Sequence, residues 1–299
     1  MEVHKVVLTT DFSELSRTAY VSAVALTQKF GAELTLVHTV ESLPPFYYMH
    51  AEGLPTDLPL DPYLDELRAT LQGEVDTQPE LRDAGANVEL IYHGFPQKAL
   101  AQFVRERDVD IVVVCTHGRT GLGHFLMGSF AEKLVRVCPA PVLVHRGSGP
   151  DQFAKILVPY DFSENSQAVL PLIRWLAENY GSKFTLAHVL EPLPYTIAQV
   201  PTPGPLAGIR ELAFDAPVVA EERFMAIRDE ELAGVDVEWE TCEGSAPTEI
   251  VHLAERGGFD LVLLATHGWT GMQHLLLGSV AEKVVRKAPC SVMTVRPPH

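Results

Sequence analysis

Two glycine-bearing segments of the chain combine residue types that suit anion binding. They run from Gly118 to Ser129 and from Gly268 to Ser279, and each returns through Gly-Ser to the start of a helical pattern. Glycine lets the main chain approach a ligand closely, and a helix N-terminus offers free N–H groups and a positive dipole end. Each serine would either cap its helix or donate its hydroxyl to the anion. We expect an anion site here, with an ordinary glycine turn and serine cap as the alternative.

One acidic residue follows the first apolar stretch of each half of the chain. Asp11 comes two residues after Thr9, and Asp161 comes two residues after Pro159. A carboxylate in this place either accepts hydrogen bonds from a ligand and contacts its Mg²⁺, or stabilises a turn through its own side chain. Position alone leaves both roles open.

The histidines beside the glycine segments do not predict a metal site. His117 and His267 precede the segments and are expected to fix the loops by hydrogen bonds. His124 and His274 also repeat, but no carboxylate or thiol at regular zinc-ligand spacing accompanies them. No residue stands out as a catalytic acid, base or nucleophile. The cysteines form no C-x-x-C pair and are predicted to be free thiols: Cys115, Cys138, Cys242 and Cys290.

Composition and charge exclude several classes of function. The formal net charge of −16 argues against sequence-independent binding of nucleic acid, which depends on a basic surface. No apolar run approaches the roughly 18 residues that a membrane-spanning helix needs. The opening segment, MEVHKVVLTTDF, begins a strand pattern without the features of a signal peptide, so we expect a cytoplasmic protein. The common phosphate motifs G-x-x-x-x-G-K-[ST] and G-x-G-x-x-G are both missing at the expected places.

The whole pattern occurs twice, at a constant offset of 150 residues. The strongest repeated block is THGRTGLGHFLMGSFAEKLVR, which recurs as THGWTGMQHLLLGSVAEKVVR. A period of this length indicates duplication of a complete domain, and 299 residues suit two domains of ordinary size. We predict a first domain at 1–146, a linker at 147–153 and a second domain at 154–299.

The sequence pattern of each half predicts five strands that alternate with four helices. Such alternation gives an open parallel sheet with helices on both faces, and ligands bind such sheets beyond the carboxyl ends of the strands. The expected strands of the two halves are Lys5–Thr9 and Lys155–Pro159, Glu33–His38 and Lys183–His188, Asn87–His93 and Asp236–Cys242, Asp110–Cys115 and Asp260–Ala265, and Pro141–His145 and Ser291–Val295.

Helix boundaries are predicted from caps and prolines. Ser13 and Ser163 are expected N-caps of first helices that end at Gly31 and Gly181. Proline-rich surface loops are expected next, at Pro44–Pro62 and Pro192–Pro217. The later helices are expected at Tyr63–Ala84 and Val219–Leu232, Gln97–Arg107 and Thr248–Arg256, and Ser129–Val137 and Ser279–Lys287.

In their order, these motifs resemble the universal stress protein family. A strand followed by Asp-Phe-Ser-Glu, a strand ending in His, the run THG-x9-GS-x-AEK-x-VR and a final apolar strand occur in both halves. The resemblance covers both halves almost end to end, so the chain resembles the tandem type. It implies the adenine nucleotide alpha hydrolase-like fold, with five strands in the order 3-2-1-4-5. That order places the loops after strands one and four on either side of the point where strand order reverses.

The resemblance also implies ATP binding, with Mg²⁺, in members that keep the motif G-x2-G-x9-G-[ST]. Both glycine segments match the later part of this motif, but Cys115 and Ala265 replace its first glycine. A Cβ at this place is expected to crowd main-chain contact with the ribose or phosphates. The site residues implied in the first half are Thr9, Asp11, Thr39, Cys115, Gly118, Arg119, Gly128 and Ser129. Those implied in the second half are Pro159, Asp161, Val189, Ala265, Gly268, Gly278 and Ser279.

Three functions remain open at this point. The favoured one is an ATP-binding stress-response protein whose nucleotide biases its conformation or its choice of an unknown protein partner. A slow ATP hydrolase would need a positioned base, for which Asp11 is the one candidate. An interaction scaffold without nucleotide would follow from the missing first glycine. The family also implies pairing through the last strands, which here would join the two halves of one chain as a pseudo-dimer, with further homodimerisation left open.

Overall fold

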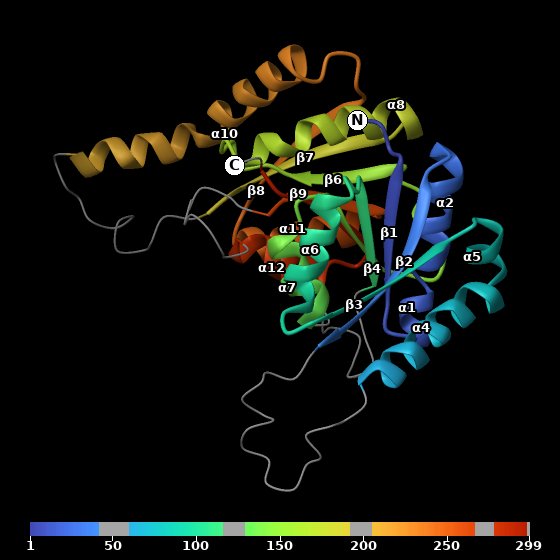
Figure 1. Ribbon diagram of the computed structural model, residues 1–299. Helices are drawn as coiled ribbons and strands as arrows, with labels where there is room; N and C mark the ends of the chain where they lie inside the picture. Colours follow the sequence, from blue (N-terminus) through green and yellow to red (C-terminus); the bar gives the residue numbers. More distant parts are fainter. Residues whose placement is uncertain (42–59, 116–128, 192–204, 267–277, 298–299) are drawn as a thin grey trace, which may run out of the picture. The chain divides into compact units, whose positions relative to one another are not determined.

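The computed structural model describes residues 1–41, 60–115, 129–191, 205–266 and 278–297 (Figure 1). The chain divides into two compact units, Glu2–Asp151 and Gln152–His299. Each unit is an α/β domain with a parallel sheet flanked by helices, as the sequence predicts.

The first domain has the strand order β3-β2-β1-β4-β5. All neighbouring pairs run parallel, so the carboxyl ends of the strands lie along one edge of the sheet. Its strands are β1 Lys5–Thr10, β2 Glu33–Glu41, β3 Asn87–His93, β4 Ile111–Cys115 and β5 Val142–His145. Its helices are α1 Glu14–Arg17, α2 Tyr20–Phe30, α4 Leu60–Thr77, α5 Pro79–Asp83, α6 Pro96–Glu106 and α7 Ser129–Val137.

The second domain repeats this order as β8-β7-β6-β9-β10. Strand order therefore reverses beside β1 in one domain and beside β6 in the other. Its strands are β6 Lys155–Pro159, β7 Lys183–Leu190, β8 Val237–Glu243, β9 Leu261–Ala265 and β10 Ser291–Val295. Its helical elements are η1 Ser166–Val169 (a 3-10 turn), α8 Leu170–Tyr180, α10 Pro205–Glu230, α11 Ala246–Gly257 and α12 Ser279–Lys287.

The central strands form the core of each domain because their side chains are apolar and covered on both faces. All five residues of β4 are buried, and β1 is buried from its second residue to its end. One carboxylate fixes the start of β1 in its register: Asp110 Oδ2 accepts the backbone N–H groups of His4 at 2.8 Å and Lys5 at 2.9 Å. Asp260 does the same for the start of β6. The predicted apolar strands are thus confirmed as the sheet interior.

Three helix caps follow the sequence prediction. The Ser13 hydroxyl accepts the Ser16 N–H at 3.1 Å and caps α1. Gly31 and Gly181 each end a helix in the left-handed conformation, both with φ of 63°. The predicted N-cap at Ser163 is wrong in detail, because its hydroxyl accepts the Ser166 N–H at the start of a 3-10 turn rather than of an α-helix.

The structure corrects three helix predictions. The first helix, expected from the Ser13 cap to Gly31, is divided into α1 and α2. The helix expected at Tyr63–Ala84 is divided into α4 and α5, because Pro79 begins a new helix in its first turn. The helix expected at Val219–Leu232 begins much earlier, at Pro205, so Pro217 lies inside α10 rather than in a loop. Pro205 does not mark a loop, because it stands at the start of the helix. The N–H of a first helical residue has no partner within the helix, so its absence removes no helical hydrogen bond.

Candidate functional site

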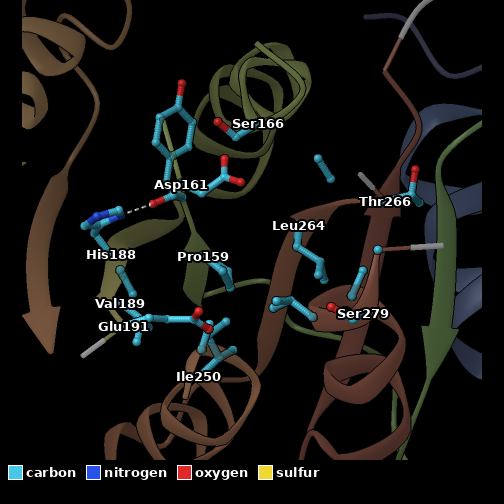
Figure 2. A pocket seen from close by; sticks show the side chains of 17 residues that line it. Pro159, Asp161, Ser166, His188, Val189, Glu191, Ile250, Leu264, Thr266 and Ser279 are labelled. Carbon is cyan, nitrogen blue, oxygen red and sulfur yellow. Dashed lines mark hydrogen bonds between the residues drawn. The ribbon is translucent and has the colours of Figure 1, made fainter. Parts of the chain in front are cut away.

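The second domain contains a cavity of about 400 Å³ at the carboxyl ends of β6, β7 and β9. The first turns of α11 and α12 also line it. Figure 2 shows side chains of β6 and β7 on one side of the space and side chains of β9 and α12 on the other. The cavity lies at the reversal of strand order, where an open α/β sheet places its ligands.

The turn after β6 holds Asp161 at the cavity wall. Its Oδ1 accepts the Ser163 N–H at 3.0 Å and the Ser163 hydroxyl at 2.6 Å. The residue between them, Phe162, has a φ of 59°, a left-handed conformation that costs a non-glycine residue about 1–2 kcal/mol. Asp11 and Ser13 repeat both hydrogen bonds in the first domain. The turn-forming role is therefore confirmed for one carboxylate oxygen in each domain.

A histidine joins the ends of the first two strands of each domain. His188 Nδ1 lies 2.9 Å from the Tyr160 carbonyl oxygen, and His38 Nδ1 lies 2.7 Å from the Thr10 carbonyl oxygen. A carbonyl only accepts, so each Nδ1 carries the proton. His188 lines the cavity, whereas the sequence predicts it only as the last residue of a strand.

The strand β9 and the helix α12 form the opposite wall. Gly278 is the N-cap of α12 and its N–H donates to the Thr266 carbonyl at 2.8 Å. Ser279 is the first helical residue, and its side chain is not the N-cap, so the capping interpretation is wrong for this serine. The main-chain N–H groups of a first helical turn have no partner within the helix. Ser279, Val280 and Ala281 of this turn all line the cavity.

Apolar side chains and one further carboxylate complete the lining. Val189 of β7 and Ile250 of α11 lie on the same side in Figure 2, with Glu191 beside them. Tyr160 is also in the wall, and burial raises the pKa of its hydroxyl, which is hydrogen-bonded to Ser166. Sequence reasoning missed Ile250 and Glu191, which come from parts of the chain that carry no motif.

The structure brings together six of the seven site residues predicted in the second half. Gly268 is the exception, since it lies outside the described residues together with His267 and His274. Ala265 lines the cavity, and the cavity is present although this residue has a Cβ where the motif has a glycine. The six are Pro159, Asp161, Val189, Ala265, Gly278 and Ser279.

The predicted residues of the first half occupy the corresponding strand and helix ends. Thr9 is buried near the end of β1, and Thr39 is half-buried in β2. Cys115 ends β4, and its thiol donates to the Leu15 carbonyl at 2.9 Å, so its sulfur is held by α1. Ser129 begins α7 and is exposed. Outside the described residues lie Gly118, Arg119, Gly128, His117 and His124.

A buried polar network adjoins the end of β1 in the first domain. The Thr10 hydroxyl lies 2.8 Å from the Tyr20 hydroxyl, and the Tyr20 hydroxyl donates to Glu74 Oε2 at 3.2 Å. Arg17 donates to both carboxylate oxygens of Glu74, at 2.5 and 3.0 Å. Burial raises the pKa of Tyr20, so this hydroxyl stays protonated and able to donate. No motif in the sequence predicts this network.

Aromatic rings replace this network in the second domain. At the same offset of 150 residues, Tyr160 stands for Thr10 and Phe224 stands for Glu74. Phe162 lies between them, with its ring centroid 5.5 Å from Tyr160 and 4.8 Å from Phe224. The two domains therefore share a backbone but differ in the polarity of the layer behind the candidate site.

Within the ranges described, no three His, Cys, Asp or Glu side chains come together as a metal site. None of the described helices has the length and apolar character needed to cross a membrane.

Comparison with known proteins decides the family. The model of the universal stress protein family matches residues 2–146 and again residues 152–296. The chain belongs to the universal stress protein family. A universal stress protein of Synechocystis sp. is 26% identical over 97% of this chain and 99% of its own length. One from Methanocaldococcus jannaschii is 30% identical over 50% of this chain and 86% of its own length.

A solved structure supports the fold of the whole chain. The crystal structure of a universal stress protein from Archaeoglobus fulgidus matches with a TM-score of 0.67 and 19% identity, and the match covers 99% of both chains. At this identity the likeness concerns the fold alone. Together with the double family match, it confirms a universal stress protein of the tandem type.

Proposed function

We propose that this universal stress protein binds an adenine nucleotide, ATP, at the carboxyl ends of its strands and acts as a nucleotide-dependent switch in a stress response. The observation that carries the proposal is the cavity of the second domain, which unites the residues predicted from the ATP-binding motif. Its volume of about 400 Å³ lies within the range of small-molecule sites.

Each part of the ligand has matching residues in the wall. Pro159, Val189 and Ile250 offer apolar contact to the adenine ring, and the Asp161 carboxylate suits the ribose hydroxyls. Gly278 and Ser279 begin α12, whose N–H groups and dipole suit a phosphate. In the first domain the same roles fall to Thr9, Asp11, Thr39, Cys115 and Ser129.

Magnesium would enter this site together with the phosphates. Its preferred ligands are oxygens, and it keeps several waters of its own, so one carboxylate and the phosphate oxygens suffice to hold it. Asp161 in the second domain and Asp11 in the first would take this role as the alternative to contact with the ribose hydroxyls. The ion would supply charge neutralisation to the phosphates.

Binding rather than turnover is the proposed activity. Hydrolysis would need a base that positions the attacking water, and Oδ1 of the candidate Asp11 already accepts two hydrogen bonds from Ser13. We therefore expect at most slow hydrolysis of ATP. Loss of turnover in Asp11→Asn with retained binding would show instead that this residue is catalytic.

The experiment is to denature freshly purified full-length protein and to identify and count the released nucleotide. We expect about one or two adenine nucleotides per chain, and a rise in melting temperature on adding Mg-ATP. Ligand at about 100 times its Kd adds roughly 2.7 kcal/mol to the free energy of unfolding. Protein that releases no nucleotide and shows no thermal shift would support the scaffold interpretation instead.

A further inference from the structure

A buried histidine ties the chain that leaves the first domain back onto that domain. His145 is the last residue of β5, and its side chain is 0% exposed. Its Nδ1 lies 2.9 Å from Oδ2 of Asp151, six residues further along the chain, and its Nε2 lies 3.2 Å from the Gly147 carbonyl oxygen. Gly147 has a φ of 119°, a conformation that favours glycine. The predicted linker therefore begins with a turn that closes on the histidine ring.

These contacts require a proton on both ring nitrogens of His145. Carbonyl and carboxylate oxygens accept hydrogen bonds but cannot donate them, so the ring must donate to Gly147 and to Asp151. A neutral imidazole has one N–H and would face the other oxygen with a lone pair. The shared proton belongs to the imidazole, because it is a stronger base than the carboxylate. His145 is therefore an imidazolium in a buried ion pair with Asp151, whose side chain is 6% exposed.

The other contact of the ring is with an uncharged side chain of α2. The Ser22 hydroxyl lies 3.1 Å from His145 Nδ1, and its oxygen accepts the Asp151 N–H at 3.0 Å. Strand β4 pairs with β5 at this level, with Cys115 in register with His145. The titratable side chains of α2 and β4 contact other groups: Tyr20 contacts Glu74, Cys115 the Leu15 carbonyl, and Lys29 the Phe30 ring. Asp151 is therefore the group that balances the charge of the imidazolium.

Serine, histidine and aspartate are also the residue types of a nucleophilic triad, but their geometry here excludes that role. In a triad, one ring nitrogen faces the serine and the other faces the aspartate. Here the Ser22 and Asp151 oxygens both lie at Nδ1 of His145. Ser22 is 2% exposed, so a substrate cannot reach its hydroxyl. The cluster is built to hold the linker and not to catalyse a reaction.

The second domain is anchored to the chain almost directly after Asp151. Phe153 is buried, its ring lies 5.0 Å from the Tyr180 ring, and its carbonyl accepts the Ser182 hydroxyl. Gln152, between the two anchors, is exposed. While Asp151 is held by the first domain, Gln152 is therefore the one residue that connects the two anchors.

The duplication did not copy this cluster. At the offset of 150 residues, Val295 stands for His145 and Leu172 stands for Ser22. Both replacements are apolar and can form neither the ion pair nor the hydrogen bond to the linker. The cluster therefore belongs to the connection between the domains and not to the scaffold that both domains share.

We propose that protonated His145 is a pH-sensitive lock on the connection between the two domains. With both ring protons in place, Asp151 is held and Gln152 alone connects the anchors. When the ring loses one proton, the Asp151 carboxylate is left buried without a cation, which is unfavourable, so it leaves the site. Residues 147–152 then become a flexible, glycine-containing connection. The lock is closed on the acidic side and opens as the pH rises, and it does not depend on a bound nucleotide.

Proteolysis within the turn measures how often the lock opens in the full-length protein. Ser148 is exposed, so Ser148→Arg gives trypsin a site between the two contacts of His145 without removing a buried group. The rate of cleavage at this site is measured from pH 7 to pH 9, with the products identified by mass spectrometry. It is divided by the rate for a free peptide of the same linker sequence, which corrects for the pH dependence of trypsin.

The corrected rate should rise about five- to tenfold over this range, because cleavage follows the population of the open form and opening releases one proton. His145→Asn keeps a donor near the position of Nδ1 but cannot titrate, so its corrected rate should not depend on pH. Asp151→Asn removes the counter-charge and should raise cleavage at pH 7 about five- to tenfold. The matched control is His252→Asn, an exposed histidine of the second domain, which should leave the pH profile unchanged. Circular dichroism of each variant checks that it is folded.

Nitrogen-15 NMR of the histidine side chains detects the protons directly in the unsubstituted chain, and loss of a signal in His145→Asn assigns it. Both nitrogens of His145 should carry a proton at pH 6, and one should lose it over the same pH interval in which cleavage accelerates. A ring with one proton at pH 6 contradicts the imidazolium, and a ring that keeps both protons at pH 9 contradicts the switch. A corrected cleavage rate that is independent of pH, or that rises equally in His145→Asn, shows that this histidine does not lock the linker.

Discussion

Tyr20 is a large side chain at 0% exposure whose hydroxyl lies between a threonine and a carboxylate. The contact with Glu74 depends on the tyrosine proton, since the Tyr20 hydroxyl donates to that carboxylate and accepts from the Thr10 hydroxyl. Ionised, it would place a second negative charge beside Glu74 in a buried site, which the low local dielectric makes expensive. The protonation state of one side chain is thus coupled to the packing of the first domain.

This coupling predicts a loss of stability at alkaline pH. Burial raises the pKa of Tyr20 in the folded protein, whereas an unfolded tyrosine ionises near pH 10. Its contribution is therefore complete below about pH 10 and is lost as the pH rises toward the folded value. We expect the free energy of unfolding, measured by urea titration and circular dichroism, to fall above that pH.

A matched variant separates Tyr20 from the other tyrosines. In Tyr20→Phe, the free energy of unfolding of the first domain should fall less steeply at alkaline pH. The second domain, followed by tryptophan fluorescence, should keep its own dependence on pH. Burial also raises the pKa of Tyr160 in that domain, and the substitution does not change it. An alkaline decline of the first domain that is the same in Tyr20→Phe would contradict the prediction.

Arg17 and Glu74 connect two elements that are distant in the sequence, α1 and α4. Glu74 is 7% exposed, and the Arg17 side chain covers it with two hydrogen bonds. Helix α1 also receives the Cys115 thiol, so it is held by β4 as well. The short helix after the Asp11 turn is fixed by these side chains, because four residues of helix are too few to be stable alone.

Removing the arginine should weaken the first domain through the charge it leaves behind. Arg17→Met leaves Glu74 buried without its cation, and we expect a loss of about 2–3 kcal/mol in the free energy of unfolding. The control is Gln167→Met, at the equivalent exposed position of the second domain, with an expected change within about 0.5 kcal/mol. Urea titrations of both variants measure the change in the free energy of unfolding. Equal changes in the two variants would show that the ion pair between Arg17 and Glu74 does not stabilise the first domain.

Sequence predicts these elements well where local rules decide and poorly where tertiary contacts do. The helix Ser129–Val137 and the strand Asn87–His93 are found with the predicted bounds, since glycine, serine and apolar periodicity mark them locally. Helix α10 begins 14 residues before its predicted start, because the prolines up to Pro217 predict a loop where the structure has a helix. All six cavity residues predicted in the second half lie within two residues of a strand or helix end. Ile250 and Glu191 came from no motif, because only the fold brings them to the cavity.

Duplication gave the molecule two copies of one scaffold whose interiors have since diverged. Asp11 and Asp161 keep the same turn, and His38 and His188 keep the same bond to the preceding strand. Behind this shared frame, Glu74 corresponds to Phe224, so one domain has an ionic network where the other has aromatic rings in edge-to-face and tilted contact. The two domains share the geometry of this turn. They differ in the side chains of the layer behind the candidate site.

The division of the chain into two compact units leads to a prediction about a chain that is cut between them. Every residue that lines the cavity lies between Pro159 and Ala281, within the unit Gln152–His299. The linker before the cut belongs to the first domain, because Asp151 Oδ2 lies 2.9 Å from His145 Nδ1 and the Asp151 N–H donates to the Ser22 hydroxyl at 3.0 Å. A chain divided after Asp151 should therefore give two folded halves, each with one cooperative transition by circular dichroism.

The separated halves should also show whether the last strands of the two domains pair, as the family resemblance implies. In a separated half, β5 or β10 would be the last strand of the domain's own order, and an edge strand favours association. If Val142–His145 and Ser291–Val295 pair within the intact chain, the separated halves should associate, each with itself or with the other, while the intact chain shows less self-association. Light scattering after size-exclusion chromatography measures this directly. Monomeric halves would show that neither edge needs a partner.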